Sequence, residues 1–195
     1  MRMEEFLEEV AKGTPTPGGG SIAALSGAIA CSLAEMVCNL TIGKKKYKEV
    51  EEDMVEIRNK INAYRKRFFE LIEEDARAFN GVIKAFRESG NVHEAYKKAA
   101  EVPYETAKIG LALFDYLKEI AIKGNKNAIS DVGVAGYMAF ASFHSALLNV
   151  KINLGEIEKD YSKEMEKKIN EMEKEMENKF KEVMEEVKQK INYFS

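Results

Sequence analysis

The sequence predicts an all-α protein, a helical bundle that forms a single domain over residues 1–195. Strand signals are almost absent, because no alternating β-branched run and no hairpin dipeptide occurs. Helical periodicity, in which apolar residues recur every three or four positions, runs along nearly the whole chain. We expect two central helices made of small residues and a long, charged C-terminal helix.

Clusters of glycine, proline and asparagine divide this pattern into six helical segments. The expected segments are residues 2–12, 20–42, 48–88, 92–122, 131–154 and 156–192. Pro103 falls inside the fourth segment. It predicts a kink or an interruption there, because proline has no N–H to donate to the preceding turn.

The second and fifth segments carry small and apolar residues on several faces. A helix that is apolar all round belongs in the middle of a bundle, and small side chains let neighbouring backbones approach closely. We therefore expect these two segments to form a central pair, with part of their surface available to a second subunit. Glu35 interrupts the second segment, and we expect it to be structural and to need a polar partner.

Three features predict a cytoplasmic protein with no membrane span. The first segment is acidic and lacks the basic start and apolar middle of a signal peptide. The second segment is too rich in alanine, glycine and serine for a confident span. Cys31 and Cys38 lie on that helix about 10 Å apart along its axis, too far for a disulfide, so buried free thiols in a reducing compartment are expected.

The net charge and the histidine content bear on two classes of ligand, nucleic acids and metal ions. The net charge of −3 does not favour binding to nucleic acid. His93 and His144 are the only histidines, and no CxxC or HExxH spacing occurs, so no metal site is expected.

The last segment has one apolar stripe among lysines and glutamates. The stripe residues are Ile157, Tyr161, Met165, Ile169, Met172, Met176, Phe180, Met184, Val187 and Ile191. Two interpretations fit the pattern: a charged outer helix that covers the bundle, or a coiled-coil contact between subunits. We favour the outer helix.

Asp75 stands out in the third segment because it lies on an apolar stripe. The stripe residues are Phe68, Ile72, Phe79, Val82, Ile83 and Phe86. A carboxylate on that face is expected to be partly desolvated, which raises its pKa toward the range useful for proton transfer at neutral pH. The alternative, favoured from periodicity alone, is a structural carboxylate satisfied by a basic side chain or a helix end.

A run of three glycines, Gly18, Gly19 and Gly20, leads through Ser21 into the second segment. Consecutive glycines have a high entropic cost, so the backbone here is expected to pass close to another group. The free N–H groups and positive dipole end of a helix N-terminus also favour anions.

Two further polar segments border the apolar helices. Lys44, Lys45 and Lys46 follow the second segment, where they complement the helix dipole or bind an anionic ligand. The loop around Asn125 leads into the fifth segment, for which Ser130 or Asp131 is a suitable N-cap. These side chains are turn and cap residues, or they add polar groups to a small-molecule pocket.

Together these pieces resemble the formiminotetrahydrofolate cyclodeaminase / methenyltetrahydrofolate cyclohydrolase family. The matching pieces run in the family's order over most of the chain: residues 14–21, 39–47, 75–79, 124–131 and 149–154. As a set they are specific, whereas the PGGGS motif alone is weak. The stretch after Asn170 is the least similar to the family.

The resemblance implies an all-α homodimer that acts on a tetrahydrofolate derivative without cofactor or metal, in histidine degradation. Asp75 would be the catalytic acid/base. The substrate-binding residues would be Gly18, Gly19, Gly20, Ser21, Lys44, Lys45, Lys46, Asn125, Ser130 and Asp131. The lysines would lie near the anionic end of the folate.

Cyclodeaminase activity, from 5-formimino- to 5,10-methenyltetrahydrofolate plus ammonia, is the expected reaction. Hydrolysis of the methenyl form to 10-formyltetrahydrofolate is the alternative, and a formiminotransferase is a possible partner. A non-catalytic helical assembly protein is the rival of another class, supported by the long charged C-terminal segment.

Overall fold

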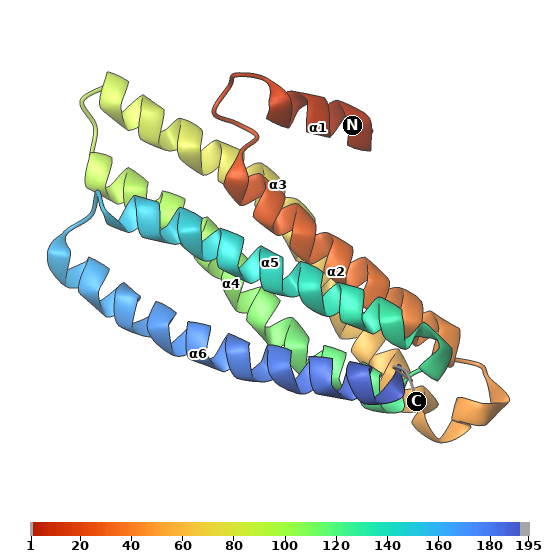
Figure 1. The fold of residues 1–195 in the computed structure, drawn as a ribbon. Coiled ribbons are helices and arrows are strands. Elements are labelled where there is room, and N and C mark those ends of the chain that lie inside the picture. Colours follow the sequence, from red (N-terminus) through yellow and green to blue (C-terminus); the bar gives the residue numbers. More distant parts are fainter. Residues whose placement is uncertain (1, 192–195) are drawn as a thin grey trace.

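The computed structural model describes residues 2–191, and within this range it contains α-helices, two short 3₁₀ helices and no strand (Figure 1). The elements are α1 (Met3–Ala11), α2 (Gly19–Thr41), η1 (Lys45–Val50), α3 (Glu51–Arg87), α4 (Val92–Lys123), η2 (Lys126–Ala128), α5 (Ile129–Leu154) and α6 (Lys159–Lys190). The all-α class and the order of the six expected segments are confirmed. Residue 192, the last of the sixth expected segment, lies outside the described residues.

Four long helices, α2 to α5, pack in a ring in which each is antiparallel to the one before it (Figure 1). α2 packs against α3 on one side and α5 on the other, and α4 joins α3 to α5. α1 lies apart from this ring, at the end where α2 begins. The N-terminus of α2 is therefore near the C-terminus of α5, and the C-terminus of α2 is near η2.

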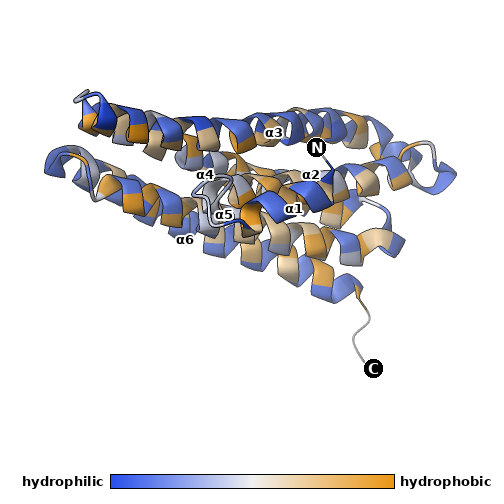
Figure 2. Cartoon of the chain, turned by 90° about the horizontal axis from the view of Figure 1, so that it is seen from above, coloured by the Kyte–Doolittle hydropathy of each residue, from blue (hydrophilic) through white to orange (hydrophobic). Residues whose placement is uncertain are grey.

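The predicted central pair of small-residue helices is confirmed by the packing of α2 on α5. Ser142 of α5 donates a hydrogen bond to the Ala23 carbonyl at 2.7 Å, and Ser26 of α2 donates to the Met138 carbonyl at 2.8 Å. Such side chain–backbone bonds across two helices need short interhelical distances, which small residues allow. Figure 2 shows that the outer helices α3 and α6 are more hydrophilic than this pair.

By length and hydropathy alone α2 would also qualify as a membrane span, and no other helix among the described residues does. In the bundle its alanine-rich side faces α3 and α5, so core packing accounts for its apolar character. Cys31 and Cys38 are buried and free, as predicted, and burial raises the pKa of the Cys38 thiol to about 12. Glu35 has the polar partners it was expected to need, since it pairs with Arg65 at 2.6 Å and accepts a hydrogen bond from Asn62.

α6 covers the bundle, as favoured from its stripe, by packing into the groove between α4 and α5. Met165, Ile169 and Met176 of the stripe are buried there. Ion pairs border the contact, with Lys179 paired to Asp115 of α4 at 2.6 Å. The stripe is therefore used within the chain.

Of the two outcomes expected at Pro103, the interruption does not occur, because α4 runs through this residue. A residue other than proline would donate its N–H to the Ala99 carbonyl. In this fold the Asn153 side chain of α5 donates to that carbonyl instead, at 3.1 Å. A neighbouring helix thus satisfies the group that proline leaves without a partner.

The apolar stripe of α3 is buried only in part. Phe68 and Leu71 are fully buried, but Phe79 and Phe86 are 36% and 57% exposed, which corrects the expectation that the whole stripe faces the core. α2 begins beside Asp75, so the last turns of α3 extend beyond the start of α2 and face mainly α4.

Candidate active site

The glycine run forms the N-terminal end of α2. Gly18 is the N-cap with extended backbone, and Gly19, Gly20 and Ser21 form the first turn. A first turn leaves N–H groups without a partner inside the helix, and no residue of this segment provides a side-chain cap. The start of α2 is thus a set of hydrogen-bond donors that another part of the protein must satisfy.

Asp75 of α3 supplies the missing acceptor. Its Oδ2 accepts a hydrogen bond from the Ser21 hydroxyl at 2.9 Å, and the Ser21 backbone N–H also donates to the carboxylate. The Ser21 hydroxyl lies 3.2 Å from the Ile72 carbonyl as well. The carboxylate therefore caps a neighbouring helix, and the helix holds it in one place.

Gly20 makes this contact possible. A Cβ built on Gly20 would lie 2.0 Å from Oδ1 of Asp75, well inside any allowed contact distance. A Cβ on Gly19 would lie 3.5 Å from the Asn149 side chain, which is an ordinary contact. A Cβ on Gly18 would lie 2.9 Å from the Pro15 carbonyl oxygen. The closest approach of the glycine run is therefore at Gly20, and its partner is the carboxylate of Asp75.

Opposing effects act on the Asp75 carboxyl. Burial is the largest and raises its pKa, while the hydrogen bonds from the Ser21 hydroxyl and backbone lower it. The net result is a pKa above the usual value of 3.8. This confirms the predicted partial desolvation of Asp75.

A cavity of about 420 Å³ opens in front of this carboxylate. Its walls include the glycine run, the aromatic side chains of Phe79 and Tyr96, and the aliphatic side chain of Ile152. Glu156 adds a second carboxylate at the rim. The combination of apolar walls and a few convergent polar groups is typical of a site for a small organic molecule.

Two amide side chains of α5 complete the cavity wall. Asn149 donates its Nδ2 hydrogen to the Ser145 carbonyl at 2.9 Å, and Asn153 donates to the carbonyls of Ala99 and Asn149. Both amides are oriented by these bonds. Within the described residues neither side-chain oxygen accepts a hydrogen bond, so both remain available to a ligand.

The sequence reasoning did not select Asn149 or Asn153 as site residues, nor Phe79, Tyr96 or Glu156. One signal was present: two amides separated by four residues on an otherwise apolar helix share one face. The position of Asn149 opposite Gly19 follows from the packing of α2 on α5 and is not encoded in either segment alone.

The other predicted binding residues lie at the opposite end of α2. Lys44, Lys45 and Lys46 stand at the start of η1, just after α2 ends. The 23 residues of α2 span about 33 Å at 1.5 Å per residue. One protomer therefore does not bring these lysines to the cavity in front of Asp75.

Asn125, Ser130 and Asp131 lie at this lysine end as well. Asn125 donates its backbone N–H to Thr41 and its side-chain amide to the Leu40 carbonyl, both at 2.9 Å, so it fastens the C-terminus of α2. The expected N-cap role of Ser130 or Asp131 was wrong, because α5 begins at Ile129 after the short helix η2. Both residues are inside the first turn, where Asp131 still complements the helix dipole.

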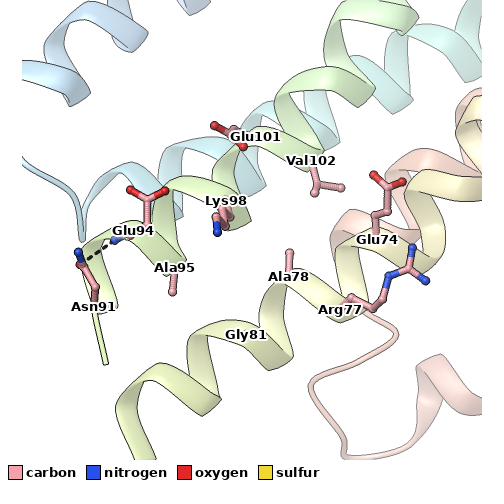
Figure 3. Close-up of a pocket in the computed structure, with 10 residues that line it drawn as sticks. All are labelled: Glu74, Arg77, Ala78, Gly81, Asn91, Glu94, Ala95, Lys98, Glu101 and Val102. Atoms are coloured by element: carbon pink, nitrogen blue, oxygen red, sulfur yellow. Dashed lines mark hydrogen bonds between the residues drawn. The ribbon is translucent and has the colours of Figure 1, made fainter. Parts of the chain in front are cut away.

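A second cavity, of about 540 Å³, lies between the end of α3 and the start of α4 (Figure 3). Two of its polar groups are engaged within the chain: Asn91 caps α4 by accepting from the Glu94 N–H, and Glu74 pairs with Arg67 at 2.7 Å. It contains none of the predicted site residues, so the cavity in front of Asp75 is the better candidate. Within residues 2–191 no group of three or more His, Cys, Asp or Glu side chains is placed to hold a metal ion.

Comparison with known proteins gives consistent relatives. The sequence model of the family described as formiminotransferase-cyclodeaminase matches residues 2–171. The chain is 41% identical over 162 residues to a methenyltetrahydrofolate cyclohydrolase of Methylorubrum extorquens, covering 77% of this chain and 78% of that protein. It is 29% identical over 172 residues to the formimidoyltransferase-cyclodeaminase of Sus scrofa. That match covers 83% of this chain but 32% of the relative, so the chain spans about a third of such proteins.

Among solved structures, the fold is similar to that of a formiminotetrahydrofolate cyclodeaminase from Thermotoga maritima. The TM-score is 0.92 and the sequence identity is 36%. The match covers 97% of this chain and 96% of the other, so it includes every helix described above.

Proposed function

Because this chain belongs to the formiminotransferase-cyclodeaminase family, we propose that it is a folate one-carbon enzyme with its active site in front of Asp75. One observation carries the placement: a carboxylate with a raised pKa is held at the wall of a cavity lined by aromatic and amide side chains. A cap alone would need neither the cavity nor the two free amide oxygens.

The proposed ligand is a reduced folate. Its flat bicyclic ring suits the space between the glycine run, Phe79 and Tyr96, where Gly19 places no side chain beside Asn149. The oxygens of Asn149 and Asn153 are suited to accept hydrogen bonds from the amino and ring N–H groups of a pterin.

In the first proposed reaction, cyclodeamination, folate N10 attacks the carbon of the protonated formimino group on N5. The carboxylate of Asp75 accepts the N10 proton and returns it to the formimino nitrogen, which leaves as ammonia. The C–N bond to that nitrogen breaks and the 5,10-methenyl cation forms. A raised pKa favours this relay, because the carboxyl must accept and release a proton near neutral pH.

In the second proposed reaction, cyclohydrolysis, water adds to the methenyl carbon and Asp75 accepts a water proton. Asp75 then returns its proton to N5 as the bond from that carbon to N5 breaks, and the hydroxyl proton of the adduct is released to water as the C=O bond of the 10-formyl product forms. The relative from Methylorubrum extorquens is named for this reaction, and the similar structure from Thermotoga maritima is named for the first. Both therefore remain candidates, with cyclodeamination placed first.

The direct test supplies the purified chain with 5-formimino- and with 5,10-methenyltetrahydrofolate, while the absorbance of the methenyl form is followed. Appearance of that absorbance identifies the cyclodeaminase, and its loss above the uncatalysed rate identifies the cyclohydrolase. Turnover of neither substrate would contradict the proposal. A formiminotransferase is the proposed source of the 5-formimino substrate.

The rival function is that of a non-catalytic helical assembly protein. A ligand that binds only the folded state raises apparent stability by mass action, so a thermal-shift series with reduced folates separates the two. Our proposal predicts a rise in Tm with folate concentration, and an unchanged Tm at saturating folate favours the assembly protein.

A further inference from the structure

Pro103 lies inside α4, one turn after Ala99, a residue that lines the cavity in front of Asp75. In a regular α-helix the N–H of residue 103 would donate to the Ala99 carbonyl. Proline has no N–H, and its ring crowds the carbonyl four residues earlier. A helix interior is also the least favourable place for proline. α4 therefore contains a backbone acceptor that its own helix cannot satisfy, and this acceptor belongs to a residue of the cavity wall.

Asn153 of α5 provides the donor that proline lacks. Its Nδ2 group has two hydrogens, and both are used: it donates to the Ala99 carbonyl at 3.1 Å and to the Asn149 carbonyl at 2.8 Å. Both partners are carbonyls, which only accept, so the NH₂ group must face them and the amide oxygen must face away. Since Asn153 lines the cavity, its Oδ1 is the atom left to a ligand.

The bond to Ala99 differs in kind from the other bonds of these amides. The Asn149 carbonyl is four residues before Asn153 on the same helix, and within the described residues the Asn149 side chain likewise donates only to its own helix, at Ser145. An amide held by one such bond can rotate about it. The second bond, to a different helix, fixes the plane of the Asn153 amide between α4 and α5.

We propose that Pro103 is a positioning residue for ligand binding: it leaves the Ala99 carbonyl free, and this carbonyl orients the Asn153 amide so that Oδ1 accepts a hydrogen bond from an N–H group of the folate ring. Pro103 itself is buried and is not part of the cavity lining, so it acts through Asn153. This role rests on the proposed function and adds a specificity residue from outside the cavity.

Pro103→Ala restores the N–H, which then competes with Asn153 for the Ala99 carbonyl. We expect KM for the folate substrate to rise about 3- to 10-fold, the effect of one lost hydrogen bond. The bond is to a part of the substrate that does not react, so kcat should stay within about 2-fold of wild type. The Tm should not fall, because alanine is the better helix former. An unchanged KM, whatever the Tm, would overturn the proposal.

A double-mutant cycle tests whether the effect passes through Asn153. Asn153→Ala removes the amide and should raise KM by itself. When Pro103→Ala is added to that variant, we expect KM to change by less than about 2-fold, because the group that Pro103 orients is already gone. If the two single effects on KM multiply instead, Pro103 acts by another route and the proposal is wrong.

Replacement of Pro103 by lactic acid, through nonsense suppression in cell-free translation, is the rescue variant. Lactic acid has the methyl group of alanine but an ester oxygen in place of the N–H, so the Ala99 carbonyl stays free for Asn153. We expect a KM close to that of wild type. A KM equal to that of Pro103→Ala would assign the effect to the proline ring and would overturn the proposal.

Thr106→Val is the control for a general disturbance of α4. Thr106 is buried, its hydroxyl donates to the Val102 carbonyl at 3.2 Å, and it is not part of the cavity lining. Valine keeps the shape and removes that hydrogen bond. We expect KM to be unchanged. A rise equal to that of Pro103→Ala would mean that any altered hydrogen bond in α4 has this effect, which would contradict a specific role of Pro103.

A measurement without folate separates the role of Pro103 from the proposed function. The side-chain NH₂ signal of Asn153 in a nitrogen-15 NMR spectrum is assigned by its absence from the Asn153→Ala spectrum. We expect its hydrogens to exchange with solvent several-fold faster in Pro103→Ala than in wild type, because one of the two bonds is lost. Equal exchange overturns the proposal. Faster exchange in a chain whose wild type turns over neither folate contradicts the proposed function and leaves the orientation of Asn153 by Pro103 supported.

Discussion

Gly20 and Asp75 occupy one another's space: a Cβ on Gly20 would lie 2.0 Å from Oδ1 of Asp75. The residues are on different helices, and the carboxylate reaches the start of α2 only because Gly20 has no side chain. Two opposing effects on the pKa of Asp75 arise at this contact. Burial raises its pKa, and the Ser21 donors hold it in place and lower its pKa.

Gly20→Ala is expected to abolish activity in a chain that still folds. The added methyl group displaces the Asp75 carboxylate from Ser21, because an aspartate side chain is too short to move aside and keep that bond. We expect kcat/KM to fall at least about 100-fold, as for loss of a general acid–base group. Steady-state kinetics and far-UV circular dichroism measure the two effects.

Gly81→Ala is the matched control for that substitution. Gly81 lies inside α3, is exposed, and a Cβ there meets no atom within 4 Å. Alanine in an open helix position stabilises by about 0.5–1 kcal/mol relative to glycine. Unchanged kcat/KM with a slightly higher Tm is expected, and equal losses of activity in both variants would refute the role of the Gly20 contact.

Asp75→Asn is expected to lower kcat about 100- to 10,000-fold while the bundle stays folded. Burial raises the folded-state pKa of Asp75 above 3.8, so its contribution to stability is fully present below the unfolded pKa and is lost as the pH rises through the folded pKa. Asparagine carries no charge to desolvate. The Tm of the variant relative to wild type should therefore increase from acidic pH to neutral pH.

Ser21→Ala is expected to move the pH–rate profile. The Ser21 hydroxyl stabilises the ionised form of Asp75, so its removal raises the pKa of that carboxyl further. Because Asp75 must be ionised at the start of the reaction, the variant needs a higher pH to become active. The acidic limb of the kcat/KM profile therefore shifts to higher pH. Threonine keeps a hydroxyl, so Ser21→Thr serves as the rescue variant. An acidic limb that is the same in all three proteins would show that Asp75 does not control it.

Salt is expected to weaken binding of folates with long glutamate tails. Raising ionic strength from 0.1 M to 1 M shortens the Debye length from about 10 Å to about 3 Å, which screens exposed lysines. We expect KM for a polyglutamylated substrate to rise several-fold, with a smaller rise for the monoglutamate. The three lysines that follow α2 are responsible if a chain that carries Lys44→Ala, Lys45→Ala and Lys46→Ala loses most of this salt dependence. Equal salt effects in that chain would assign the tail to other cations.

Gly27→Ala is expected to destabilise the bundle and to leave the chemistry of the site intact. A Cβ on Gly27 would lie 2.4 Å from the Phe68 ring in the core between α2 and α3. Overpacking a filled core costs about 1–3 kcal/mol, so the midpoint of urea unfolding should decrease by a corresponding amount. A stability equal to wild type would mean that the two helices separate without cost at this point.

Much of the fold follows from local patterns. The helices begin and end at the glycine, proline and asparagine clusters, and the stripe spacing correctly assigns α6 to the outside of the bundle. Asp75 is identified as a desolvated carboxylate from its stripe alone, because helical periodicity reports which side of a helix is buried. The resemblance to a family adds a chemical task to that position.

Local patterns fail where a neighbouring helix changes the outcome. Pro103 does not break α4, since the Asn153 side chain donates to the carbonyl that proline leaves free. Phe79 is on the predicted apolar face but is part exposed and lines the cavity, because α2 starts too late to cover it.

The sequence by itself determined the helices, their buried faces and the pairing of small-residue segments in the core. Only the tertiary structure decided how far each helix is shifted along its axis relative to its neighbours. This axial shift places Gly20 against Asp75 and Asn149 against Gly19, and it leaves Lys44 at the far end of α2. The physical reason is that periodicity specifies rotation about a helix axis, whereas translation along the axis depends on contacts between segments distant in the chain.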